Sequence, residues 1–501
     1  MRKIFLFILI FFSSSLGAQP LSPQYTVTSG FTDLNPRFGN KRFFNNFPLR
    51  YELIVFERHI PSGSNICMLR AGSDTISTQV TYVTNDSYMN TNPAIAYTRV
   101  SSFGDTIARA LIVWESFRNG KSWIYAKAFN SAGWSEVFAI DTSEGNKYKP
   151  DVYNYGADLF AVVYENNGDI QYKHINVQNL QTTYSFNLTQ ADTAYCSAPR
   201  IGGKAEGSGS KILISYNRRK ANNQNDVYCH RMLAYSVWLG PDTVSATYDN
   251  KTSIIFGNHW GNLVAVYERI ENGKSHIRGT IINMYNNSAS QKETEIVPQS
   301  PYATQNFDNY FYPIITDNMG EAAIYNLGSY SYKTNDSLKL KLLRGNFNSA
   351  SDSVTLGDSS KNTTLTINNG IYNSPYSMAM WVVYSKDSLT FSNICAKRTV
   401  IYTNRIEQLG LINPNRYNLY QNFPNPFNPS TNIEFDVPKT GFVNITVFDL
   451  LGREIAVLVN QEMRNGRFNV TWNANHTPSG IYFCRMTAGD YLKTMRMLLI
   501  K

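Results

Sequence analysis

One short pattern recurs seven times between residues 25 and 402, and it restricts the possible folds more than any other feature. Each copy is an apolar run that ends in an aromatic residue, followed by a polar turn and a second strand-like run. Successive aromatic residues lie 58, 50, 52, 51, 58 and 59 residues apart. A period near 50 with several strands per repeat is typical of the blades of a β-propeller. The aromatic residues are Phe56, Trp114, Tyr164, Tyr216, Tyr267, Tyr325 and Tyr384.

The turns inside the repeats carry a hairpin signal. Asn119-Gly120, Asn167-Gly168 and Asn272-Gly273 fall three to six residues after the aromatic residue of their repeat. Asn-Gly supplies the two positive-φ residues of a type I′ turn, so the aromatic strand should pair antiparallel with its successor. The aromatic strands are apolar at nearly every position, which predicts burial on both faces, as in blades that stack between two neighbours.

Proline stands before an apolar segment near the start of most repeats, a position that suits the innermost strand of a blade. We therefore predict an all-β fold with a seven-bladed β-propeller over residues 25–402. Six or eight blades stay open, because outer strands and ring closure leave no signal in the sequence. No Trp-Asp signature, kelch Gly-Gly doublet or sialidase Asp-box marks the repeats. The prolines are Pro36, Pro93, Pro150, Pro199, Pro313 and Pro375.

Charge and composition argue against a nucleic-acid-binding role. The formal net charge is +9, of which the N-terminal Arg2 and Lys3 contribute two and the last 86 residues three, which leaves about +4 for the body. Those charges are dispersed, whereas a nucleic-acid interface clusters Lys and Arg on one element. The one basic triplet, Arg218-Arg219-Lys220, lies in an Asn-rich turn, and we interpret it as a solvated loop tip. Aromatic residues make up 14% of the chain, which favours strands.

Five cysteines occur, and their placement argues against disulfides. Cys67, Cys229 and Cys395 stand in similar contexts in three repeats, where other repeats have a small residue. We interpret them as buried, unpaired small hydrophobic residues at one equivalent position. Cys196 and Cys484 have no evident partner.

The N-terminus has the three parts of a secretory signal peptide over residues 1–18. Arg2 and Lys3 form a basic region, Ile4 to Phe12 an apolar region, and Ser13 to Ala18 a run of small residues. Cleavage is expected between Ala18 and Gln19. No other stretch approaches the roughly 20 apolar residues that a membrane span requires.

The last 86 residues, Arg416 to Lys501, carry an ordered set of motifs. They include a Gln-Asn-Phe-Pro-Asn-Pro-Phe-Asn-Pro run, a strand end with Asp-Leu-Leu-Gly-Arg, a Trp strand, a Ser-Gly-Ile-Tyr turn and a Met-Leu-Leu-Ile-Lys tail. This segment resembles the type A C-terminal sorting domain of the type IX secretion system, with Cys484 where an aromatic or aliphatic residue is usual. The motifs lie at Gln421 to Pro429, Val447 to Arg453, Trp472, Ser479 to Tyr482 and Met497 to Lys501.

The resemblance implies a small antiparallel β-sandwich that the outer-membrane secretion machinery recognises and normally removes. It covers about a sixth of the chain and gives the route of export rather than the activity of the body. The expected organisation is a signal peptide (1–18), a propeller (25–402), a linker (403–415) and a sorting domain (416–501). The mature protein should be secreted or displayed on the cell surface, with no transmembrane anchor.

Four glutamates are the most suggestive polar residues of the body, because each directly follows the aromatic residue of its repeat. At strand ends they could line one rim of the propeller channel, and a glycosidase needs two nearby carboxylates. A repeated residue more often has a structural role, however, so we favour carboxylates that accept backbone N–H groups in the tight turn. These candidate binding residues are Glu57, Glu115, Glu165 and Glu268.

No motif indicates a cofactor, a metal or a catalytic nucleophile. The six histidines are scattered without metal-ligand spacing, and Gly207-Ser208-Gly209 lacks the Lys of a phosphate-binding loop. Trp134, Trp238 and Trp260 could stack on sugar rings or lie between blades. A non-enzymatic binding or adhesion module for a glycan or protein ligand is the preferred hypothesis, and a carbohydrate-active hydrolase or lyase is the alternative.

Overall fold

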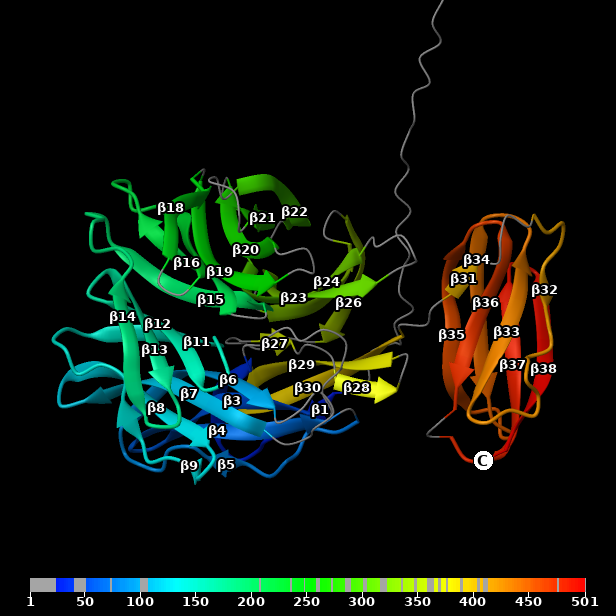
Figure 1. Ribbon diagram of the computed structural model, residues 1–501, viewed down its shortest axis with the longest axis horizontal. Coiled ribbons are helices and arrows are strands. Elements are labelled where there is room, and N and C mark those ends of the chain that lie inside the picture. The colour runs from blue at the N-terminus through cyan, green and yellow to red at the C-terminus, as the bar shows by residue number, and fades with distance from the viewer. Residues whose placement is uncertain are drawn as a thin grey trace, which may run out of the picture. The chain divides into compact units, whose positions relative to one another are not determined.

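The structure, a computed structural model, is built of β-strands, and the residues that it describes contain no helix (Figure 1). No described segment forms an apolar helix that is long enough to cross a membrane. The chain divides into a body, Leu21–Tyr372 with Ala379–Thr399, and a C-terminal domain built mainly from Val400–Lys501. The described residues are 24–39, 51–72, 74–99, 107–206, 209–234, 237–246, 248–257, 262–271, 274–283, 290–300, 304–315, 322–334, 337–346, 349–357, 365–367, 371–374, 377–387, 391–402, 406–408, 413–474 and 477–500.

Four successive repeats of the body each form a four-stranded antiparallel sheet, with strands in chain order. We name each four-strand unit by its aromatic residue, which lies on the second strand in every case. The strands of the Tyr164 and Tyr216 units are β11 (Lys147–Asn154), β12 (Leu159–Asn166), β13 (Asp169–Asn176), β14 (Gln181–Asn187), β15 (Cys196–Glu206), β16 (Gly209–Arg219), β17 (Asn225–Ala234) and β18 (Val237–Ser245). Those of the Tyr267 and Tyr325 units are β19 (Asp249–Gly257), β20 (Asn262–Glu271), β21 (Lys274–Asn283), β22 (Ser290–Ser300), β23 (Thr304–Ile315), β24 (Ala322–Thr334), β25 (Ser337–Asn346) and β26 (Ser349–Gly357).

The first two repeats share one nine-stranded sheet, which differs from the expectation of one sheet per repeat. The two halves are joined by a single parallel pair, Ser64 with Met89, and each half otherwise has the order of the other units. The Phe56 unit consists of β2 (Thr32–Phe38), β3 (Tyr51–Ile60), β4 (Gly63–Gly72) and β5 (Thr81–Tyr82). The Trp114 unit consists of β6 (Met89–Arg99), β7 (Ile107–Arg118), β8 (Lys121–Asn130), β9 (Gly133–Trp134) and β10 (Phe138–Ala139).

The last sheet of the body combines the two ends of the repeat region. β1 (Tyr25–Thr26) pairs antiparallel with β30 (Ser392–Tyr402), placing Tyr25 opposite Ala396 and Thr26 opposite Cys395. The backbone N–H of Val27 continues this pairing by donating to the carbonyl of Ile394 at 2.8 Å. The N-terminal strand therefore completes the sheet of the last repeat. The remaining strands of this Tyr384 unit are β27 (Leu365–Ile367), β28 (Ile371–Ser374) and β29 (Ser377–Asp387).

The first strand of each unit contacts the first strand of the next. β2 contacts β6, β6 contacts β11, and the series continues through β15, β19 and β23 to β27, which in turn contacts β2. The arrangement of sheets is propeller-like, with the apolar second strands packed between neighbouring sheets.

The aromatic residues fill the space between units. Trp114 shares an apolar core cluster with Val55 of the preceding unit, and Tyr164 shares one with Val113 of the Trp114 unit. Val113 and Trp114 are adjacent in sequence, so their side chains point to opposite faces of the sheet. The near-continuous apolar runs are thus buried on both faces, as predicted.

Two of the predicted hairpins are confirmed by their backbone angles. Asn119 and Gly120 have φ values of 51° and 76°, and Asn167 and Gly168 have values of 51° and 90°. Each pair joins two strands through a two-residue loop, as the Arg118–Lys121 and Asn166–Asp169 pairings show. Asn272-Gly273 lies outside the described residues.

The prolines at 36, 93, 150 and 199 lie in first strands, and each follows a residue with positive φ. The angles are 50° at Asn35, 51° at Asn92, 49° at Lys149 and 52° at Ala198. The strand register shifts at each of these points, so every proline marks a β-bulge. A bulge re-aims the backbone N–H of its first residue away from the ladder.

The C-terminal domain consists of two four-stranded antiparallel sheets that enclose one apolar core. In that core the Trp472 ring packs against Phe427 and against Tyr482, and Cys484 is also a member of the core. Part of the predicted linker belongs to this domain, because Ile406–Gln408 pairs with Phe468–Val470. The strands are β31 (Ile406–Gln408), β32 (Asn418–Leu419), β33 (Ser430–Val437), β34 (Gly441–Phe448), β35 (Glu454–Met463), β36 (Gly466–Asn473), β37 (Gly480–Ala488) and β38 (Tyr491–Leu499).

All five cysteines are free thiols and buried, so the predicted burial is confirmed. Cys67, Cys229 and Cys395 were predicted to share one equivalent position, and for Cys67 and Cys229 this prediction is wrong. Cys67 pairs with the aromatic Phe56, whereas Cys229 pairs with Ser215, the residue before the aromatic Tyr216. A shift of one residue moves a side chain to the other face of a strand. Cys67 consequently packs with Trp381 of the last unit, and Cys229 packs with Tyr267 of the following unit.

Candidate functional site

Three of the four predicted glutamates lie buried at the ends of second strands. Glu57 ends the apolar part of β3, Glu115 that of β7 and Glu165 that of β12. Glu268 occupies the same position on β20, where its backbone pairs with Lys251 and Ile277. Its side chain lies outside the described part of the chain.

Each of the three buried carboxylates accepts a backbone N–H from the next unit. Glu57 Oε1 accepts the N–H of Asn92 at 2.7 Å, and Glu165 Oε2 accepts that of Ala198 at 3.3 Å. Glu115 Oε1 accepts the N–H of Lys149 in a short hydrogen bond. The donors are the positive-φ residues of the three bulges, so we call these contacts the bulge latches. The sequence had suggested the tight turn of the same repeat instead.

Asparagine side chains extend the latches in the first two units. Asn35 Nδ2 donates to Glu57 Oε1 at 2.7 Å, and Asn92 Nδ2 donates to Glu115 Oε1 at 2.9 Å. Asn92 thus bridges two glutamates, one through its backbone and one through its side chain. Burial raises the pKa of Glu115, although the hydrogen bonds from Lys149 and Asn92 oppose that shift. These two carboxylates hold neighbouring units together.

Glu165 breaks the symmetry of the series. It has the hydroxyl of Tyr195 as a donor to Oε1 where the other two have an asparagine, and Lys149 Nζ lies 3.9 Å from Oε2. The guanidinium of Arg219 lies over the Tyr195 ring, 5.0 Å from its centroid. The hydrogen bond to Glu165, followed by burial, raises the pKa of Tyr195 to about 12. The phenol is therefore neutral at physiological pH.

The members of this group differ in solvent exposure. The Lys149 side chain is 55% exposed while that of Glu165 is 4% exposed. Tyr148, Tyr195 and Arg219 are exposed as well. We call these five residues the Glu165 cluster. It presents two cations and two aromatic rings to solvent, and its one carboxylate faces inward.

Sequence reasoning missed all of this cluster except Glu165. Arg219 belongs to the basic triplet that we interpreted as a solvated loop tip. In the structure Arg218 forms a bidentate ion pair with Asp192, with distances of 2.6 and 2.8 Å, and Lys220 pairs with Asp226 at 2.6 Å. One sequence feature could have pointed to the two tyrosines. Tyr148 precedes the bulge proline Pro150 by two positions, and Tyr195 precedes Pro199 by four.

An exposed aromatic ring with an arginine over it recurs beside the starts of the first strands. Because the second strand of an antiparallel sheet ends where the first begins, and the bulge latches join these ends, the rings share one face of the body. We call it the connector face. The ring-to-guanidinium distances are 4.2 Å for Phe31–Arg58, 4.2 Å for Tyr88–Arg118, 5.0 Å for Tyr195–Arg219 and 5.9 Å for Tyr248–Arg269.

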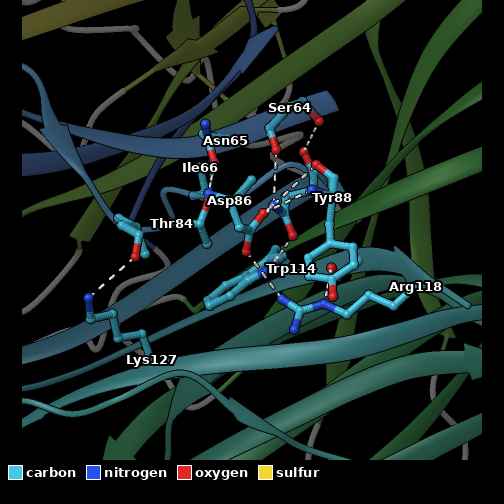
Figure 2. Close-up of polar contacts among 12 residues, drawn as sticks. Ser64, Asn65, Ile66, Thr84, Asp86, Tyr88, Trp114, Arg118 and Lys127 are labelled. Carbon is cyan, nitrogen blue, oxygen red and sulfur yellow. Dashed lines mark hydrogen bonds and ion pairs between the residues drawn. The ribbon is translucent and has the colours of Figure 1, made fainter. Parts of the chain in front are cut away.

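The segment that carries Tyr88 shows how such a ring is held (Figure 2). Trp114 Nε1 donates to Asn90 Oδ1 at 3.1 Å, and Asn90 Nδ2 donates to Asp86 Oδ1 at 2.7 Å. Asp86 also pairs with Arg118 at 3.4 Å and accepts the backbone N–H of Tyr88 at 3.1 Å. Figure 2 shows the Tyr88 ring beside the Arg118 side chain. The connector is therefore preorganised by a closed polar network.

The tryptophans that the sequence suggested as sugar-stacking residues contact side chains of the fold where they are described. Trp134 is partly exposed and packs on Phe129, with ring centroids 5.3 Å apart. Trp238 donates its indole N–H to the hydroxyl of Tyr184 at 3.2 Å. Trp260 lies outside the described residues. Within the described ranges, no three His, Cys, Asp or Glu side chains gather as a metal site.

Comparison with protein families identifies residues 421–501 as a secretion system C-terminal sorting domain. The resemblance to the type IX sorting domain is confirmed, with a start five residues after the predicted one at 416. The protein is accordingly exported, with a secreted or cell-surface location, and its sorting domain interacts with the type IX secretion machinery. No curated protein matches the chain.

Several solved structures show weak likeness to the chain. An ulvan lyase of polysaccharide lyase family PL25 is 11% identical, with 75% of this chain and 96% of that one covered and a TM-score of 0.45. The Dos1 propeller is 9% identical, with 76% and 95% covered and a TM-score of 0.37. A sialidase of Trypanosoma rangeli is 6% identical, with 93% and 84% covered and a TM-score of 0.37. Likeness at this level does not bear on activity.

Proposed function

We propose that this exported protein is a non-enzymatic binding or adhesion module built on a closed seven-bladed β-propeller over residues 25–402. The series of first-strand contacts that returns from β27 to β2 supports ring closure. The pairing of β1 with β30 supports it as well, because the N-terminal strand would complete the seventh blade. In this proposal residues 1–18 are a signal peptide cleaved between Ala18 and Gln19, and the sorting domain directs the folded body outward.

The binding surface in this proposal is the connector face, centred on the Glu165 cluster. The observation that supports it is the difference in solvent exposure within the cluster. The cations and aromatic rings face solvent, whereas the Glu165 carboxylate is buried and hydrogen-bonded. Aromatic rings present large, rigid contact areas, and exposed Lys and Arg attract anions. We propose an acidic glycan as the ligand, with sugar rings on Tyr148 and Tyr195 and carboxylate or sulfate groups at Lys149 and Arg219.

The latch geometry favours binding over glycoside hydrolysis. A glycosidase uses two carboxylates that both reach the scissile bond. Glu57 and Glu115 instead direct their oxygens at Asn35, Asn92 and Lys149. In each glutamate one oxygen, Oε1, accepts both of these hydrogen bonds, and it would have to leave its backbone and amide donors before it could act on a substrate.

One observation favours the alternative, a hydrolase or lyase. The Glu165 cluster places the Tyr195 hydroxyl beside a carboxylate and near two cations, and such asymmetry is typical of catalytic sites. A lyase would need Tyr195 as a base, however, and its raised pKa opposes proton abstraction near neutral pH. Binding without turnover is therefore the preferred proposal.

A glycan array probed with the purified mature protein tests this function. We expect signals on uronate-containing or sulfated glycans and none on their neutral counterparts. Lys149→Ala and Arg219→Ala should each weaken binding about tenfold, whereas Lys121→Ala, which removes an exposed cation from another turn, should not. Equal binding of neutral glycans, or equal losses in all three variants, would contradict the proposal.

The glycans that bind on the array also test whether the protein is instead a hydrolase or lyase. Each bound glycan is incubated with the protein, and new reducing ends and unsaturated uronates are measured over time. Release of either product that is lost in Tyr195→Phe would establish the hydrolase or lyase. Binding without product supports the adhesion module.

A further inference from the structure

The most exposed apolar side chains of the described residues lie in the sorting domain. Phe423 is 78% exposed, Leu451 77% and Leu450 67%. A single exposed apolar side chain is ordinary, but several large ones gathered at one place commonly mark an interaction site. The three residues stand on two loops: the turn between β34 and β35, and the proline-rich segment before β33.

The leucine turn is held rigid by one carboxylate. Asp449 Oδ1 accepts the backbone N–H groups of Leu451 and Arg453, each at 2.9 Å, and Asp449 Oδ2 accepts Arg453 Nε at 2.7 Å. The backbone N–H of Asp449 in turn donates to the carbonyl of Arg453 at 3.0 Å. Desolvation alone would raise the pKa of the Asp449 carboxyl, but the hydrogen bonds from the backbone and side chain of Arg453 and from the backbone of Leu451 lower it. The two leucines are therefore displayed on a fixed scaffold and do not collapse onto the core.

The segment that carries Phe423 is fixed as tightly. Phe423 exchanges two backbone hydrogen bonds with Asn432, both at 2.9 Å. Buried Asn422 donates to Thr431 Oγ1 at 2.9 Å, and Asn425 Oδ1 accepts the N–H of Leu498 at 2.8 Å. These polar side chains hold the loop so that the Phe423 ring points outward.

Both loops lie at the same end of the sandwich. Phe448 pairs with Phe483 near the start of β37, so the turn that follows it is at that end of the sheet. The end of β38 lies there too, because Ile481 pairs with Leu498, and Figure 1 marks this end of the chain with C. Phe427 bonds to Leu498 and Ile500 through its backbone, which brings the proline-rich segment to the same place. We call this end, with Phe423, Leu450 and Leu451, the apolar tip.

We propose that the apolar tip is the surface by which the type IX outer-membrane machinery recognises this protein, with the two leucines and Phe423 seated in an apolar pocket of that machinery. A sorting domain must be bound by its transport machinery, which supplies a partner for the exposed side chains. Rigid loops lose little conformational freedom when they bind, so even a small apolar contact can give useful affinity. This inference is independent of the ligand of the body.

Export assays of the full chain in a host with a type IX system test the proposal. The test variants are Leu450→Ser with Leu451→Ser, and separately Phe423→Ser. The matched controls are Phe442→Ser and Leu492→Ser, which remove exposed apolar side chains at the opposite end of the sandwich. Secreted and periplasmic pools are quantified in each strain.

We expect the tip variants to lower the secreted fraction at least about tenfold, with full-length protein accumulating in the periplasm, and the controls to export normally. Protease resistance and the urea midpoint of the periplasmic protein should match the wild type, which separates lost recognition from lost folding. Normal export of the tip variants, or an equal defect in the controls, overturns the proposal. Loss of a dimer in the tip variants with unchanged export would assign the surface to a second copy of the chain.

Discussion

Two histidines are buried titratable side chains in the interior of the body. His174 is buried among Tyr155, Tyr172 and Tyr184, with ring centroids 4.5, 5.1 and 5.6 Å away, and His230 stacks on Tyr216 at 5.6 Å. Burial lowers the pKa of each imidazole to about 4. Both are neutral in the folded protein at pH 7, and both would be partly charged in the unfolded chain below pH 6.5.

Acidification should therefore destabilise the body over a defined range. Because the folded pKa lies below the unfolded value, the stability is complete above pH 6.5, falls as the pH drops toward 4, and changes little below that. The loss is on the order of 2–3 kcal/mol for each histidine. Urea midpoints measured from pH 7.5 to 4.5 should show it, and His174→Gln with His230→Gln should flatten the slope. His59→Gln, at a partly exposed histidine, serves as the control; an unchanged slope in the double variant would refute the assignment.

At the scale of strands and sheets, the bulge latches are the contacts that join successive units. A bulge turns one backbone N–H out of the ladder, and a buried glutamate of the preceding unit accepts it. The glutamate that follows each aromatic residue and the proline that marks each bulge thus belong to one contact between successive units. The repeated glutamates and prolines were both visible in the sequence. Their connection was not, because the donor is a backbone N–H, which any residue type can supply.

Removal of one latch should cost measurable stability. Glu115→Ala leaves the Lys149 N–H and the Asn92 amide without their acceptor in a buried place, and we expect a loss of roughly 2–4 kcal/mol in the free energy of unfolding. Glu115→Gln keeps one acceptor oxygen and should cost less. Glu136→Ala, at an exposed glutamate, should change stability by about 0.5 kcal/mol at most. A similarly small effect of Glu115→Ala would mean that the latch contributes nothing.

The predictable elements were those with local causes. Strand type, the hairpins at Asn119-Gly120 and Asn167-Gly168, and the first-strand prolines followed from dihedral and periodicity rules. The predicted equivalence of Cys67 failed because Cys67 stands one position earlier on its strand than Ala126 and Gly279 do: it pairs with the aromatic residue of its unit, whereas they pair with the residue before it. β1 escaped notice as an outer strand because two residues carry no periodicity. The Glu165 cluster escaped because its members are separate in sequence and meet only across sheets.

At the scale of the whole molecule, the pairing of β1 with β30 joins the two ends of the body. Val27→Pro removes the N–H that donates to Ile394 and disturbs a buried side chain. We expect a loss of about 3 kcal/mol or more and faster proteolysis of the last unit. Ser29→Pro, at an exposed residue outside the strand, is the control. Equal stability of the two variants would argue against a structural role for this closure.

The sorting domain should be separable from the body. A chain that ends at Tyr402 keeps β30 and omits β31, which pairs within the C-terminal domain. We expect this truncated protein to fold and remain in the periplasm, because each part has its own core. Cell fractionation with a protease-resistance assay measures both outcomes, and normal surface delivery would contradict the sorting role.

The late position of β30 also sets an order of events during synthesis. Tyr25 is among the first residues of the body to be synthesised, yet its strand partner Ala396 lies 371 positions later, counted along the printed sequence. The outermost strand of the last sheet can form only when nearly the whole body has emerged, and such distant pairings are slow to form. Until then β1 lacks its strand partner and is open to pairing with other chains, so a chaperone that shields β1 would raise the yield of monomer. Circular permutation that joins β1 directly to β30 would make this contact local and should speed refolding.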